Sequence, residues 1–242
     1  MEKRIIARGL LAGAIGGVLA FLFARTFVEP VITRAIGYEE SHEHGHEHGV
    51  ELFTRGVQAN VGMGFGVLAF SVAMGGLFAV AYCMAYSRVG NLSPRLQSVL
   101  LAGGMFLSLY VIPFLKYPPS PPAARIEETI RQRTLLYLLM VVLSAAMLVA
   151  SGYVGRRLVG QFGQWSATLI GAGTYVVAIA LVMLVLPTID GTPDDFPADV
   201  LYEFRLYSLG TQLVLWAMIG LVFASMADRL LRQKQGAEQV SA

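Results

Sequence analysis

Residues 134–153 read TLLYLLMVVLSAAMLVASGY, a stretch of the chain without a single charged side chain. A helix of about 20 apolar residues crosses the roughly 30 Å hydrocarbon core of a bilayer, and a backbone in lipid must satisfy its own hydrogen bonds. Similar segments recur along the chain, so the sequence predicts an all-α fold, a polytopic membrane helix bundle of about six transmembrane helices. The predicted spans are residues 5–28, 57–86, 96–115, 134–153, 165–186 and 208–227.

The composition agrees with this prediction. Hydrophobic residues make up 55% of the 242 residues and charged residues 14%, whereas a typical soluble domain is about 25% charged. A net charge of +2, with no basic patch carrying aromatic residues, predicts no nucleic-acid partner. The chain starts with a charged Glu2-Lys3-Arg4 before its first apolar run, but it lacks a convincing cleavage site, so we expect a retained first helix.

Charge is distributed unevenly between the two predicted sides of the membrane. With six spans, both termini lie on the same side as the segments 88–95 and 155–164. That side carries ten basic and three acidic residues, and the opposite side carries eight basic and thirteen acidic residues. Because basic residues favour the cytoplasmic side, we expect a bacterial cytoplasmic membrane protein with both termini in the cytoplasm. The outer loops would then be 29–56, 116–133 and 187–207.

All four histidines lie in the segment SHEHGHEHG at 41–49, inside the first outer loop. Imidazole is a common ligand for divalent cobalt, nickel, copper and zinc, and the glycines allow the backbone to fold around an ion. A solvated polar linker is the alternative. We expect a metal-binding, histidine-rich extracytoplasmic loop that captures an exchangeable ion. Its candidate ligands are His42, His44, His46, His48, Glu43 and Glu47.

A few polar side chains lie at the outer ends of the predicted spans, and others in the acidic third loop. Polar groups near the apolar region of a membrane are costly and are often functional. Solvation by interfacial water is the simpler alternative for each of them. The candidates for the entrance of an ion path are Glu29, Gln58, Asn60, Gln212, Asp194 and Asp195.

Small residues spaced four apart predict where helices pack closely, because they let two backbones approach in lipid. Gly9 and Gly13, continued by Gly17, form such a row in the first span. The second span repeats the pattern at Gly62 and Gly66, and the fifth at Ala167 and Gly171.

The sequence lacks the G-x-x-x-x-G-K-[ST] phosphate loop, the H-E-x-x-H zinc motif and the G-x-S-x-G elbow. We therefore expect neither ATP hydrolysis by this chain nor another enzymatic activity, and no resident cofactor.

Three groups of motifs make the chain resemble the probable cobalt transporter subunit CbtA family. The first comprises RGLLAG at 8–13, FVEPVI at 27–32 and RGVQ at 55–58; the second comprises PFLKYP at 113–118 and RTLLY at 133–137. The third comprises FPADVL at 196–201 and FRLYSLGTQ at 204–212. One departure is Ser120, where the family pattern leads us to expect asparagine.

This resemblance implies a permease subunit for uptake of a divalent transition-metal cation, cobalt, linked to cobalamin supply. It also implies a small single-span, histidine-containing partner of the CbtB type beside the lipid bilayer. A non-transporting membrane metal sensor or assembly factor is the alternative. A membrane enzyme is the weaker alternative, because the candidate ligands lie beside glycines on a loop and not on rigid elements.

Overall fold

The structure is a computed structural model that describes residues 2–42, 54–86, 92–124, 126–189 and 191–240. Within these ranges it contains helices and no strand. Five of its helices are long and apolar enough to cross a membrane: Lys3–Ser41, Arg55–Tyr86, Pro94–Lys116, Glu128–Val185 and Ala198–Ala227. They leave large apolar side chains exposed, such as Phe65 at 76% and Leu184 at 81%, as lipid-facing helices do. The predicted all-helical membrane character is confirmed.

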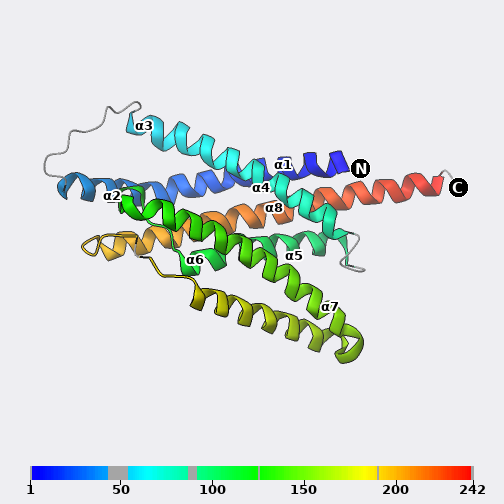
Figure 1. The fold of residues 1–242 in the computed structure, drawn as a ribbon. Helices are drawn as coiled ribbons and strands as arrows, with labels where there is room; N and C mark the ends of the chain where they lie inside the picture. The colour runs from blue at the N-terminus through cyan, green and yellow to red at the C-terminus, as the bar shows by residue number, and fades with distance from the viewer. Residues whose placement is uncertain (1, 43–53, 87–91, 125, 190, 241–242) are drawn as a thin grey trace. The chain divides into compact units, whose positions relative to one another are not determined.

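The chain divides into two compact units, which we describe separately (Figure 1). Unit 1 holds residues 1–103 and 202–242, and unit 2 holds residues 104–201. Unit 1 contains α1 (Glu2–Phe23), η1 (Ala24–Val28), α2 (Glu29–His42), α3 (Arg55–Val57), η2 (Gln58–Gly62), α4 (Met63–Tyr86), most of α5 (Pro94–Phe106) and most of α8 (Ala198–Val240).

The first helix is longer than predicted, because α1, η1 and α2 follow one another without a break to His42. We expected a loop from Glu29 onward, where the apolar span ends. Pro30 should also interrupt the helix, because proline clashes with the carbonyl four residues earlier. For Pro30 that carbonyl belongs to Thr26, which lies inside the π-helical turn η1. A π-helical turn widens the hydrogen-bond spacing and lets the helix continue past the proline. Residues 29–42 of the expected loop are therefore helical, as are residues 198–207 of the expected third loop.

Close packing of α1 against α4 explains the glycine row of the first span. A Cβ built on Gly9 would overlap the carbonyl of Gly75, and one on Gly75 would lie 2.8 Å from the Cα of Gly13. The predicted small-residue contact of α1 is thus confirmed. The structure does not show this contact for Gly62 and Gly66: among the described residues, a Cβ on Gly66 would meet nothing within 4 Å and one on Gly62 only the Val57 carbonyl at 3.8 Å.

Aromatic side chains join α4 to α8 in the core of unit 1. The ring of Phe223, which is fully buried, lies 5.0 Å from that of Phe78 and 4.9 Å from that of Tyr82, in edge-to-face geometry. Such arrangements are preferred by aromatic quadrupoles. These ring contacts pack α4 against α8.

Unit 2 is built around one long helical element. It contains η3 (Leu107–Val111), α6 (Ile112–Lys116), η4 (Pro122–Ala124) and α7 (Glu127–Val185), with the last residues of α5. The 59 residues of α7 would extend about 90 Å as one straight helix. Gly163, however, has the non-helical φ of 74° and ψ of 166°, a backbone conformation that glycine adopts without strain. It divides α7 into a first arm, 127–162, and a second arm, 164–185.

The two arms of α7 fold back on each other (Figure 1). A Cβ on Gly155 would lie 3.1 Å from the carbonyl of Ala167, and one on Gly171 would lie 3.1 Å from the carbonyl of Ser151. The predicted contact through Ala167 and Gly171 is confirmed. The arms match the predicted spans 134–153 and 165–186, although the structure counts them as one continuous candidate span.

A buried hydrogen bond links the arms across the core of unit 2. The Ser144 and Tyr175 hydroxyls are 2.8 Å apart, among the buried apolar residues Ile112, Met140 and Ile179. Because an unpaired hydroxyl in an apolar interior is costly, this pair fixes the register of the two arms.

Candidate functional site

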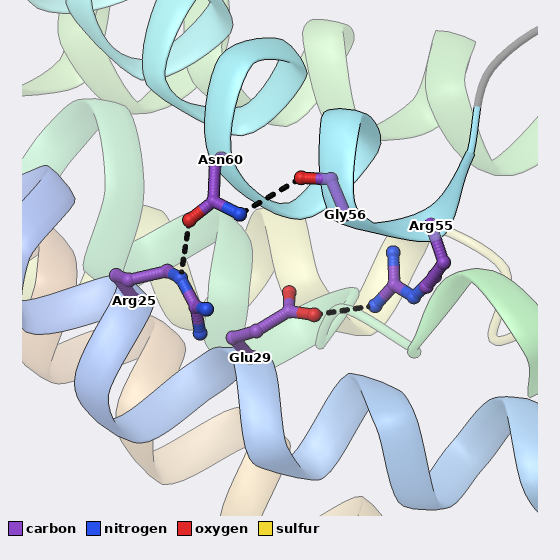
Figure 2. A network of polar contacts seen from close by, with 5 residues as sticks. All are labelled: Arg25, Glu29, Arg55, Gly56 and Asn60. Carbon is purple, nitrogen blue, oxygen red and sulfur yellow. Dashed lines mark hydrogen bonds and ion pairs between the residues drawn. The ribbon is translucent and has the colours of Figure 1, made fainter.

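Two arginines connect the first helix of unit 1 to the start of the second (Figure 2). Arg55 on α3 forms a 2.7 Å ion pair with the Oε1 atom of Glu29 on α2. Arg25 on η1 donates to the Oδ1 atom of Asn60 at 2.9 Å, and the Asn60 Nδ2 atom donates to the Gly56 carbonyl at 2.8 Å. We call these five residues the Glu29 network. It brings together two of the predicted entrance residues, Glu29 and Asn60.

Glu29 is the buried member of this network. Its side chain is 7% exposed, whereas that of Arg55 is 39% exposed. The second carboxylate oxygen, Oε2, is also buried and has no hydrogen-bond partner among the described residues. A buried charge is retained only when it is paired, so the ion pair with Arg55 stabilises the ionised carboxylate while leaving one oxygen uncommitted.

The π-helical turns place the two sides of the Glu29 network. Glu29 directly follows η1, and Asn60 lies within η2. Pro30 accounts for η1, but no proline lies within or just after η2. Single π-helical turns of this kind occur frequently at functional sites, and η2 is the one that carries Gln58 and Asn60.

The structure also describes the other predicted entrance residues. Gln58 is exposed on η2, and Gln212 is half-buried on α8. Asp194 and Asp195 are exposed and belong to unit 2. Sequence reasoning missed Arg25 and Arg55 as partners. The sequence signal for the ion pair was the opposite charge of Glu29 and Arg55 at the two ends of the first predicted loop.

The predicted metal ligands cannot be placed. His44, His46, His48, Glu43 and Glu47 lie outside the described residues, as does the side chain of His42. In the part of the chain that the structure does describe, no three His, Cys, Asp or Glu side chains form a group that could hold a metal ion. The histidine-rich capture site remains a prediction from the sequence.

A second polar network holds two connections of unit 2 together. Arg133, on the first arm of α7, donates to the carbonyls of Pro118 at 2.8 Å and Gly191 at 3.3 Å, and to the Ser120 hydroxyl at 3.5 Å. The Ser120 hydroxyl also lies 2.8 Å from that of Thr192. One arginine thus fastens the proline-rich segment to the segment after α7. Ser120, the departure from the family pattern, takes part directly.

Two further contacts reinforce this connection. The Tyr117 hydroxyl donates to the Pro187 carbonyl at 2.7 Å, and the Lys116 ammonium donates to the Thr188 hydroxyl at 3.0 Å. Burial raises the pKa of Tyr117 above its ordinary value, so the phenol keeps the proton that it donates. The motifs PFLKYP and RTLLY are therefore joined in space, and their polar side chains have a structural role.

Pro113 in the same motif explains another contact. Proline has no N–H to donate to the carbonyl four residues earlier, which here belongs to Leu109 inside η3. The Tyr137 hydroxyl donates to that carbonyl at 3.5 Å. Tyr137 also lines a cavity of about 310 Å³ in unit 2, together with Tyr110, Phe114 and Arg133.

Comparison with known protein families identifies the chain. A family model described as CbtA, probable cobalt transporter subunit, matches residues 2–228. The chain therefore belongs to the CbtA family, as its motifs predicted. No curated protein and no solved structure matches it.

Proposed function

We propose that this member of the CbtA family is the membrane permease subunit that moves a divalent transition-metal cation, cobalt, into the cell. The observation that carries this proposal is the family match over residues 2–228 on a chain whose described part holds five candidate membrane helices. Cobalt is the substrate in this proposal, and its supply to cobalamin synthesis is the role that the family resemblance implies.

In this proposal α7 crosses the membrane twice, which gives six spans. Each arm contains a predicted span of about 20 residues, the length that a bilayer requires, and Gly163 supplies the turn. Both termini then lie on one side, and the excess of basic residues there favours the cytoplasm.

The proposed path begins at the histidine-rich tract. His42, His44, His46 and His48 would capture the ion outside, with Glu43 and Glu47 beside them. Asp194 and Asp195 would raise the local cation concentration, and Glu29, Gln58, Asn60 and Gln212 would form the entrance. An inside-negative membrane potential supplies about 2.3 kcal/mol per charge per 100 mV, and about twice that for a divalent ion. A small single-span partner of the CbtB type would complete the transporter.

Uptake of radioactive cobalt by cells expressing the chain tests the proposal, with and without a candidate partner. We expect uptake above that of empty-vector cells in at least one setting. Uptake no greater than that of the vector in both settings would refute transport and favour the sensor or assembly-factor alternative.

Replacing the four histidines of the tract by alanine tests its role as a collector. The concentration of cobalt needed for half-maximal uptake should rise, because capture weakens, while the maximal rate stays nearly unchanged. Loss of the maximal rate would instead place the tract inside the path. Matched alanine replacements of Glu39 and Glu40, just before the tract, serve as controls for a general change in loop charge.

A further inference from the structure

The two partners of the Glu29–Arg55 ion pair differ in how easily they can leave it. Glu29 follows η1 within a continuous helix, and its side chain is almost fully buried. Arg55 lies in the first turn of the continuous helix Arg55–Tyr86, with a side chain that is 39% exposed. Because the Arg55 side chain is much more exposed than that of Glu29, it can rotate away from the ion pair more easily. The carboxylate is the fixed partner, and the guanidinium is the exchangeable one.

Once Arg55 leaves, the buried Glu29 carboxylate needs another partner. A buried, unpaired carboxylate is strongly disfavoured. The Oε2 atom already lacks a hydrogen-bond partner among the described residues, so a metal ion could bind one or both carboxylate oxygens. Arg25, the other cation of the network, is hydrogen-bonded to Asn60.

The Glu29 network also contains the amide oxygen of Asn60. The Asn60 amide belongs to η2, the π-helical turn that no proline explains, and its Oδ1 atom accepts from Arg25 at 2.9 Å. Carboxylate, amide and water oxygens together suit divalent cations. The network therefore combines a buried anion, a displaceable cation and neutral oxygen donors.

From this geometry we propose that Glu29 is an internal binding site for a divalent cation, occupied by the Arg55 guanidinium until the metal ion displaces it. This inference deepens the proposed function, because the role of the Glu29 site in transport rests on that proposal. Arg55 thereby lowers the affinity of the site for the metal and allows release, because the guanidinium can return to the carboxylate.

Metal binding to the purified full-length chain in lipid nanodiscs tests the competition directly. Co²⁺ is the only metal added, and binding is followed by isothermal titration calorimetry. Every variant is made in a chain whose four histidines are replaced by alanine, so that the histidine-rich tract does not contribute to binding. All variants should be titrated at the same pH and ionic strength. Arg55→Gln should raise the affinity for Co²⁺ by about tenfold, or about 1.4 kcal/mol. Glu29→Gln should abolish this binding, and the double variant should behave like Glu29→Gln.

Arg34→Gln is the matched control. This variant also removes one positive charge, here from the first helix, where Arg34 pairs with Glu203 of α8. We expect a much smaller change in Co²⁺ affinity. Equal effects of Arg34→Gln and Arg55→Gln would reduce the result to net charge and overturn the proposal, as would Co²⁺ binding that survives Glu29→Gln.

A second measurement tests the displacement of Arg55 even if the Arg55→Gln variant does not fold. Arg55→Lys preserves the positive charge and introduces an amine that can be acetylated and quantified by mass spectrometry. Co²⁺ should accelerate acetylation at position 55, and the acceleration should disappear when Glu29→Gln is added. Lys3, Lys116 and Lys234, the three native lysines, provide internal references. An acetylation rate at position 55 that Co²⁺ leaves unchanged would contradict displacement.

The two proposals fail in different ways. Cobalt binding at Glu29 without cellular uptake would refute transport and leave the site standing. Normal uptake by a chain carrying Glu29→Gln would refute this site and leave the transport function standing.

Discussion

The contact between α1 and α4 makes the sharpest stability prediction, through Gly75→Ala. The added Cβ would overlap the Gly9 carbonyl and lie 2.8 Å from the Cα of Gly13, whereas non-bonded carbon atoms prefer about 3.5–4.0 Å. The two helices must therefore separate by about 1 Å along their closest approach. Overpacking of this kind costs about 1–3 kcal/mol.

Gly66→Ala on the same helix is the matched control. Both substitutions gain the same helix propensity, about 1 kcal/mol at most, but a Cβ on Gly66 would meet nothing within 4 Å. The difference between the two variants therefore isolates the packing cost. For a chain of this size, each kcal/mol shifts the Tm by about 2–4 °C. Thermal unfolding of both variants in one detergent should place Gly75→Ala lower. Equal Tm values would refute the close packing.

Three further predictions concern unit 2. Gly191→Ala should lower the Tm, because the new methyl group would overlap the Arg133 guanidinium. The overlap would break hydrogen bonds from a charged donor, which are worth about 1.5–3 kcal/mol each. An unchanged Tm would contradict this arrangement. Ser144→Ala should cost about 1–3 kcal/mol by leaving the Tyr175 hydroxyl unpaired, and adding Tyr175→Phe should recover much of that loss in a double-mutant cycle. The Tyr117 hydroxyl has a raised folded-state pKa, so its stabilisation is present below the unfolded value near 10 and is lost as the pH rises above it. Tyr117→Phe should make the alkaline loss of stability shallower in unfolding measured between about pH 9 and 11, and an identical pH profile would oppose this prediction.

The helical spans could be predicted from the sequence because lipid leaves the backbone few choices. Long apolar runs must satisfy their hydrogen bonds internally, so residues 57–86 and 96–115 agree closely with Arg55–Tyr86 and Pro94–Lys116. The glycine row of α1 was also predictable. Gly66 shows the limit of that reasoning, because a spacing of four defines a helix face but does not show whether another helix lies against it.

Helix ends were harder to predict, because the same proline has opposite effects in different surroundings. The apolar span ends at residue 28, just before Glu29 and Pro30, yet η1 relieves the proline clash and the helix continues to His42. Pro113 is likewise preceded by a π-helical turn, η3. The partners of Glu29 could not be predicted either, since the pairing depends on how α3 lies beside α2 and not on spacing within one helix.

Arg55 and Arg133 show why similar side chains should respond differently to substitution. Arg133 donates to two carbonyls and a hydroxyl in separate segments, so its removal would leave several acceptors unpaired and loosen both segments. Arg55 instead neutralises one buried carboxylate, and a divalent cation can take over that task. Loss of Arg133 should therefore appear mainly as reduced stability. Loss of Arg55 should change cation affinity as well as stability, because the proposed site gives a metal ion the place that the Arg55 guanidinium holds beside Glu29.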